Sequence, residues 1–270
     1  MTEILGYAFM QKALAVSILG SIACGIIGTL VTVNRMSALA GSIAHASFGG
    51  LGLAYVAGFN PLIGATGFAL LSALGVAAVS SRSRRRTDTA MAAIWAAGMA
   101  TGLVLVKLSG TYAANLMSWL FGSLLAVSDS DILFAVILNA ILILAIVLFY
   151  KEFLAISYDR QFSRLQGVPV NFFRGLFLVL TALTAVLLMR VTGLIMVIAL
   201  LALPSAIAEM FTRSLWRMMV MASVLAALFS TGGLFLAWWL DLPPGAVIIL
   251  IASAAFGLAL LIEKLRSLKN

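Results

Sequence analysis

The sequence is poor in the side chains that build catalytic and metal centres in soluble proteins. Its 270 residues include one cysteine, one histidine and nine acidic residues. The lone Cys24 excludes a disulfide or a cysteine metal cluster within one chain. No nucleophile–base pair, H-E-x-x-H helix or Gly-rich Walker loop is present, so any ATP-driven step needs a separate polypeptide. We therefore expect neither an enzyme nor a covalently bound cofactor.

Charge is also scarce, whereas apolar residues are abundant. Only 10% of residues are charged and 63% are hydrophobic, with a mean hydropathy of +1.16, far outside the range of soluble domains. The uncharged runs reach the roughly 20 residues that a helix needs to cross a bilayer, about twice the length of a barrel strand. These features predict an all-α, multi-pass transmembrane bundle in contact with lipid, forming a single domain over residues 1–270 of a prokaryotic cell membrane.

Nine spans are predicted, with eight as the alternative. The doubtful segment is Gly175 to Ala208, which is interrupted only by Arg190 and is long for one crossing but short for two. We expect a tight turn at Arg190–Gly193. The nine predicted spans are Ala13–Val33, Ala38–Phe59, Leu62–Ser81, Ala90–Val106, Ile132–Tyr150, Gly175–Met189, Val191–Ala208, Met218–Leu240 and Ala246–Ile262.

The distribution of basic residues supports nine spans and sets the orientation. With the N-terminus outside, nine spans place 14 of the 17 lysine and arginine residues inside, as the positive-inside rule requires. Eight spans would divide them almost evenly. Because the net charge of +8 lies in short loops rather than in a soluble basic domain, we do not expect the chain to bind nucleic acid.

His45, the only histidine, lies inside the uncharged run Ala38–Phe59. Ionisable groups at membrane depth are costly and often functional, and imidazole is a ligand for zinc and other late first-row metals. His45 is therefore the candidate metal ligand. The alternative is a structural histidine that hydrogen-bonds Ser42, Ser17 or a backbone carbonyl.

Other residues are candidates for lining or gating a path near His45. Ser42 lies one turn before the histidine, and Gly49 belongs to a group of glycines that favours close helix packing. Pro204 removes a backbone hydrogen bond from the seventh span, and Glu209 follows at its inner end. We hold Ser42, Gly49, Pro204 and Glu209 as candidate path-lining or gating positions.

The two longest loops differ in character. The outer loop Lys107–Asp131 contains an apolar stretch, Asn115–Gly122, that is too short to span and is expected to lie at the interface or to re-enter the bundle. Asp129, Asp131 and Asp241 are predicted outside, where they form either an acidic mouth or, as we prefer for Asp131, a helix cap.

The inner loop Lys151–Arg174 contains a predicted short amphipathic helix. It begins near Asp159, ends at Gly167 before Pro169, and places Phe162 and Leu165 on one face. Such a helix either docks a soluble partner or rests on lipid headgroups.

Several segments together resemble the membrane subunits of the zinc, manganese and iron ABC importers, the ABC transporter family 3. They occur in the family's order over almost the whole chain. The matching segments are Met36-Ser37, Ala44-His45-Ala46-Ser47, Trp119–Leu125, Tyr158–Val168, Gly193–Ala208 and Leu242–Ala246.

The resemblance implies a homodimeric permease that imports a divalent metal by alternating access. It further implies a cytoplasmic ATPase beneath each copy and a periplasmic or cell-surface protein that delivers the metal. In this comparison the inner helix is the coupling helix held by the ATPase. The residues carried over to that role are Tyr158, Asp159, Arg160, Phe162, Ser163 and Gly167.

One position departs from the family. Members commonly carry an aspartate four residues before the histidine, where this chain has Gly41. Three explanations stay open: His45 acts with serine or backbone oxygens, two His45 residues act together in a dimer, or the substrate is a non-metal solute or a metal chelate. An ion-coupled secondary transporter or a membrane scaffold without an ATPase is the alternative from another class.

Overall fold

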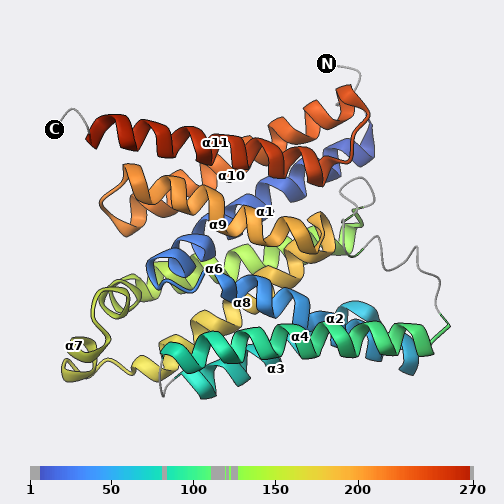
Figure 1. Cartoon of the computed structure of the whole chain (residues 1–270), viewed down its shortest axis with the longest axis horizontal. Helices are drawn as coiled ribbons and strands as arrows, with labels where there is room; N and C mark the ends of the chain where they lie inside the picture. The colour runs from blue at the N-terminus through green and yellow to red at the C-terminus, as the bar shows by residue number, and fades with distance from the viewer. Residues whose placement is uncertain (1–6, 81–83, 111–118, 120–121, 123–126, 268–270) are drawn as a thin grey trace.

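The structure, a computed structural model, describes residues 7–80, 84–110, 119, 122 and 127–267. These residues form ten helices and no strand, and nine of the helices are long and apolar enough to cross a membrane (Figure 1). The predicted all-α bundle of nine spans is therefore confirmed. The helices are α1 (Ala8–Val33), α2 (Ala38–Ala57), α3 (Pro61–Ser80), α4 (Arg84–Leu108), α6 (Asp129–Tyr158), α7 (Arg160–Leu165), α8 (Val170–Thr192), α9 (Leu194–Phe211), α10 (Leu215–Leu240) and α11 (Pro244–Ser267).

The predicted turn between the sixth and seventh spans is also confirmed. Helix α8 ends at Thr192, α9 begins at Leu194, and Gly193 between them has φ +84°. This left-handed conformation costs a glycine little, so two spans can follow each other through a single residue.

Several helix ends lie further out than predicted. Helix α6 continues to Tyr158 and α8 begins at Val170, so most of the predicted inner loop Lys151–Arg174 is helical. The span prediction stopped at charged residues. Lysine and arginine side chains, however, are long enough to place their charge in the headgroup layer while their backbone stays helical. A spanning helix can therefore continue past the first charged residue.

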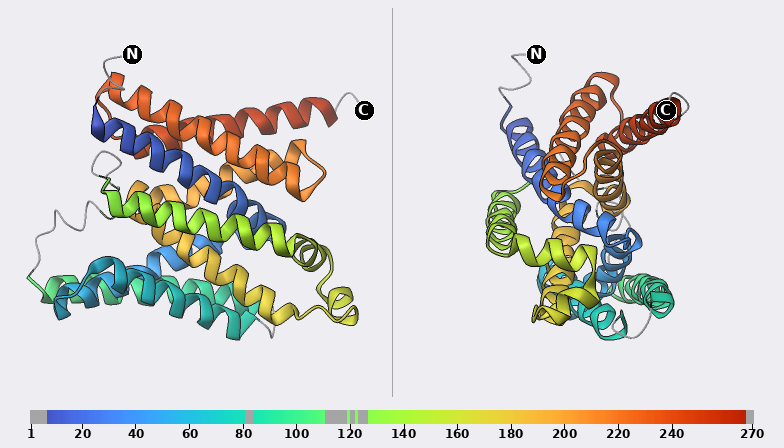
Figure 2. Two further views of the ribbon diagram at one scale, coloured as in Figure 1. Left: turned by 180° about the vertical axis from the view of Figure 1, so that it is seen from behind. Right: turned by 90° about the vertical axis from the view of Figure 1, so that its left-hand side faces the viewer.

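The helices form a slab with two different faces. Helices α11, α9 and α4 lie toward the viewer in Figure 1, whereas α10, α1 and α6 lie toward the viewer from behind in Figure 2. In the right-hand view of Figure 2, α11 and α4 project on one side and α6 lies on the other. Helices α4 and α11 are the least buried spans, with 17% and 22% of their apolar windows covered.

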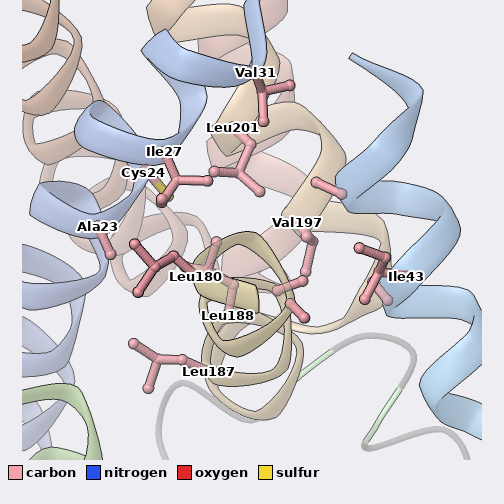
Figure 3. Close-up of a cluster of buried hydrophobic side chains, with 14 of the residues drawn as sticks. Ala23, Cys24, Ile27, Val31, Ile43, Leu180, Leu187, Leu188, Val197 and Leu201 are labelled. Carbon is pink, nitrogen blue, oxygen red and sulfur yellow. The ribbon is translucent and has the colours of Figure 1, made fainter. Parts of the chain in front are cut away.

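The core joins the two faces through α1, α8 and α9. Leu180, Leu187 and Leu188 of α8 pack against α1 and α9, and all three side chains are almost fully buried (Figure 3). Ile43 connects α2 to this cluster. A hydrogen bond also joins two of these helices: the hydroxyl groups of Thr32 on α1 and Ser205 on α9 lie 2.8 Å apart.

Helix α2 approaches its neighbours through glycines. A Cβ at Gly98 or Gly102 of α4 would collide with the backbone of α2 at Ala46 and Phe48. Such residues let two helix backbones pack directly together in a membrane. Helix α2 is consequently fixed by backbone contacts as well as by side chains.

The outer end of the bundle is closed by charged contacts. Arg190, in the last turn of α8, pairs with Asp131 at an Nε–Oδ1 distance of 3.1 Å. Its guanidinium carbon also lies 5.1 Å from the ring centre of Trp119, whose indole nitrogen donates to the Tyr55 hydroxyl of α2 at 3.3 Å. The cluster Tyr55–Trp119–Arg190–Asp131 therefore links α2, α6 and α8.

The acidic residues of the outer side differ from the predicted roles. Ser128, not Asp131, is the N-cap of α6, and Asp131 is the third residue of a capping box with Ser128. Asp129 pairs with Lys12 at 2.7 Å, and Asp241 is the C-cap of α10. Because Asp129 and Asp131 each have a basic partner, the two carboxylates do not form an open acidic mouth. Of the apolar stretch Asn115–Gly122, all but Trp119 and Gly122 lies outside the described residues.

Replacing Asp131→Asn should destabilise the protein by about 2 kcal/mol, because the change removes the charge of a nearly buried carboxylate that pairs with Arg190 and accepts from Ser128. The matched control is Asp129→Asn, whose carboxylate is exposed and whose ion pair is expected to contribute less than about 1 kcal/mol. Thermal unfolding of both variants in detergent measures the difference. Equal unfolding temperatures for the two variants would show that the cluster Tyr55–Trp119–Arg190–Asp131 does not stabilise the bundle.

Candidate functional site

His45 lies near the middle of α2, where this helix meets α4. Its ring stacks on the Trp95 ring of α4, with centroids 4.7 Å apart and an angle of 28° between the planes. The imidazole is partly exposed, and Trp95 is 45% exposed. Both side chains therefore reach the outer surface of the single chain at the level of the hydrocarbon.

No hydrogen bond to a described residue holds the imidazole. Its Nδ1 atom is buried and has no partner in the part of the chain that the structure covers. The two serines of the structural alternative behave differently: Ser42 donates to the Ala38 carbonyl at 2.8 Å, and the buried Ser17 hydroxyl is itself unpartnered. A neutral imidazole with an unengaged nitrogen has the chemistry of a metal ligand.

One chain supplies only one such ligand here. Among the described residues, no group of three or more His, Cys, Asp or Glu side chains is placed to hold a metal ion. Zinc and manganese sites in proteins use several ligands, so His45 needs groups from elsewhere to complete a coordination shell.

The position one turn before His45 is filled by an apolar side chain. A Cβ at Gly41 would lie 2.8 Å from both Cγ1 and Cδ1 of Ile198 on α9. Ile198 thus occupies the space in which a side chain at position 41 would stand. Residues four apart share one face of a helix, so His45 and the Gly41–Ile198 contact lie next to each other on α2.

Two candidate path-lining residues of α2 are buried in the packing. Ser42 is 1% exposed, and its hydroxyl bonds to its own helix. Gly49 is buried where α2 meets α3 and α4, and a Cβ there would press on the Phe68 ring. In this conformation neither faces the surface that carries His45.

The two candidates of α9 are placed differently. Pro204 is buried, and α9 runs through it from Leu194 to Phe211. Glu209 is exposed and lies 11 residues, or about three turns, after Ile198. Glu209 and Ile198 therefore lie on the same face of α9, which is exposed beside α2, whereas Pro204 does not.

The predicted inner helix is present as α7. It begins after Asp159, whose carboxylate accepts from the backbone N–H groups of Gln161 and Phe162 at 2.8 and 3.1 Å. The Ser163 side chain is buried and donates to the Asp159 carbonyl at 2.7 Å. The segment ends at Gly167, which has φ +81°. The helix is therefore ordered by its own caps.

Three large apolar side chains in and beside this helix are exposed. Tyr158, Phe162 and Leu165 are 82%, 56% and 86% exposed. Arg160, which the sequence grouped with them, instead turns inward and donates to the Asn34 side chain at 3.1 Å. The exposed trio is a surface suited to another protein or to lipid.

Sequence reasoning missed Trp95 and Ile198. Both lie in apolar helical runs that carry no local motif, and only the tertiary crossing of α2 with α4 and α9 brings them to His45 and Gly41. The glycines of α2 were a usable signal for these crossings, but they do not identify the side chain on the partner helix.

Comparison with known proteins gives one family. The family described as "ABC 3 transport family" matches residues 6–263. An uncharacterized membrane protein of Synechocystis is 42% identical over 260 residues, which are 96% of this chain and 92% of that protein. A manganese transport system membrane protein of Listeria monocytogenes is 35% identical, covering 94% and 91% of the two chains.

A solved structure agrees with these relatives. The chain matches PsaBC from Streptococcus pneumoniae, solved in complex with Fab, with a TM-score of 0.88 and 31% identity over 100% of this chain and 98% of that one. Both the sequence and the arrangement of helices are therefore similar over the full length. This multi-pass membrane protein belongs to the ABC 3 transport family.

Proposed function

We propose that this chain is the membrane permease subunit of an ATP-binding cassette importer that carries a divalent metal ion into the cytoplasm by alternating access. Manganese, zinc and iron are the candidate ions. The observation that carries the proposal is the unbonded imidazole of His45, partly exposed at mid-membrane on a chain whose relatives include a manganese transport protein. An ionisable residue kept at that depth without a structural hydrogen bond is best explained by function.

Two copies of the chain would complete the path. The His45 side chain, Ile198 and Glu209 lie on the face of α2 and α9, which the little-buried α4 and α11 flank. A partly exposed imidazole is costly against lipid, whereas a second copy on this face brings a second imidazole and a second Glu209. Their arrangement in a homodimer supplies the additional ligands that one chain lacks.

The energy would come from a separate ATPase at the inner side. The exposed trio of Tyr158, Phe162 and Leu165 provides an apolar contact on a helix whose ends are fixed by Asp159 and Gly167. When a soluble partner displaces a rigid short helix of this kind, α6 and α8 move with it, because α7 is directly connected to both. A metal-binding protein at the outer side would deliver the ion.

A second candidate substrate is a non-metal solute or a metal chelate. Ile198 favours it, because an isoleucine beside His45 makes that part of the path less polar than a carboxylate would. Such a surface suits a larger and less charged solute better than a hydrated ion.

The first test is His45→Ala in vesicles that contain the chain and its ATPase. ATP-driven uptake of manganese, zinc or iron should fall by about tenfold or more, because the substitution removes the imidazole from both copies in the proposed dimer. The matched control is Ser47→Ala on the same helix, whose buried hydroxyl bonds the Ala44 carbonyl within the chain. Metal uptake that survives His45→Ala at the control's level would overturn the metal path through His45.

The second test separates the two substrates by rebuilding the site. Gly41→Asp combined with Ile198→Ala removes the clash and sets a carboxylate one turn from His45. For a metal path, the ratio of manganese to zinc uptake should rise by about fivefold or more, because carboxylate oxygens favour manganese more than imidazole does. Gly41→Asp alone should give less folded protein. A double variant that folds but loses all transport would favour the solute or chelate.

The third test concerns the ATPase. Phe162→Ala with Leu165→Ala should reduce the amount of ATPase that co-purifies with the chain by about tenfold, because buried apolar anchors dominate such interfaces. Leu108→Ala, at the outer end of α4 and 74% exposed, is the matched control. Undiminished co-purification of the double variant would show that α7 is not the docking helix.

A further inference from the structure

A cleft of about 480 Å³ opens at the inner end of the bundle, away from the surface around His45. It is bounded by the α1–α2 turn, the start of α4, the α6–α7 junction and the first turns of α8. Its polar lining includes Asn34, Arg35, Arg160 and Arg174, together with Asp88 and Asp159. The cleft therefore brings three arginines from three separate segments together.

Arg174 is the unusual member of this lining. It stands near the start of α8, and its Nε atom is buried without a hydrogen-bond partner in the described part of the chain. Arg160 and Arg164 lie near enough for their positive charges to act on it. A buried guanidinium nitrogen without an acceptor is costly, and two neighbouring cations increase that cost.

Two carboxylates also line the cleft, and neither forms an ion pair with Arg174 among the described residues. The Asp159 carboxylate is engaged by the backbone N–H groups at the start of α7. Asp88 is exposed, and the described residues show no ion pair for it. Arg160 and Arg164 donate to the amide oxygens of Asn34 and Asn171, at 3.1 and 3.3 Å.

We propose that this cleft is a binding site for a phosphate-bearing anion, held by Arg174 with help from Arg160 and Arg35. The planar guanidinium fork matches the oxygens of a phosphate, and the cleft is far larger than one carboxylate requires. It lies on the side of the membrane that carries most of the basic residues, where basic pockets between helices bind lipid headgroups. The source is either an anionic phospholipid of the inner leaflet or a phosphate compound of the cytosol.

A bound phosphate would act on the position of α7. The cleft is lined on one side by the junction that begins α7 and on the other by the turn that begins α2, so one anion would contact both. It would reduce the repulsion among Arg160, Arg164 and Arg174 and hold these segments together. The site is separate from His45 and does not depend on which solute is transported.

The experiment uses the full chain in nanodiscs and in detergent. Native mass spectrometry compares retained phosphatidylglycerol with retained phosphatidylcholine, and thermal unfolding is followed with and without inorganic phosphate. Arg174→Gln should weaken the retention of phosphatidylglycerol, or the stabilisation by phosphate, by about tenfold, because it removes a charge-assisted bond. Arg174→Lys keeps the charge and should retain part of the binding.

The matched control is Arg213→Gln, an exposed arginine at the same end of the bundle in the α9–α10 turn. It should leave binding unchanged. A preference for phosphatidylglycerol identifies the lipid, whereas stabilisation by phosphate alone identifies a soluble compound. The proposal is overturned if Arg174→Gln and Arg213→Gln lose binding equally, or if wild-type protein responds to neither ligand.

Discussion

The position of α2 is the constraint on which the rest of the structure depends. This helix runs between α3, α4, α8 and α9. Glycines on α2 and on the helices that pack against it let the backbones come close together, where larger side chains would hold them apart. Close backbone approach gives dispersion contacts without ordering long side chains, which is how helices associate when lipid removes the hydrophobic drive between them. His45 is consequently held on a helix that has little freedom to shift by itself.

The same packing explains why the surroundings of His45 are apolar. On α2 the polar side chains Ser42 and Ser47 bond to their own helix, as small hydroxyls do when no water is present. Trp95 then stacks on the histidine ring, and Ile198 fills the space beside Gly41 one turn away. The imidazole has no hydrogen-bond partner among the described residues, so its chemistry depends on what approaches the surface of α2 and α9.

The sequence was sufficient for the parts of the fold that depend on composition and local geometry. Span number and the Gly193 turn follow from apolar length and from one residue that tolerates positive φ, and α7 follows from the cap at Asp159 and the stop at Gly167. The sequence was insufficient where the role of a residue depends on contacts with residues far away along the chain. Asp131 looked like a simple cap, but its second role is set by Arg190, 59 residues later. Likewise, Gly41 looked like a missing ligand until Ile198 was found in its place.

The two ends of the bundle are stabilised in different ways, and this difference bears on how the molecule works. At the outer end, Arg190 and Lys12 are each matched by a carboxylate of α6, so these described charges are satisfied within the chain. At the inner end, Arg160 and Arg164 lie close enough to Arg174 for their charges to act on it, and Phe162 and Leu165 of α7 are exposed. Because the buried Nε atom of Arg174 has no partner among the described residues and exposed apolar area favours binding, the inner end is the part of the molecule best suited to contact other components.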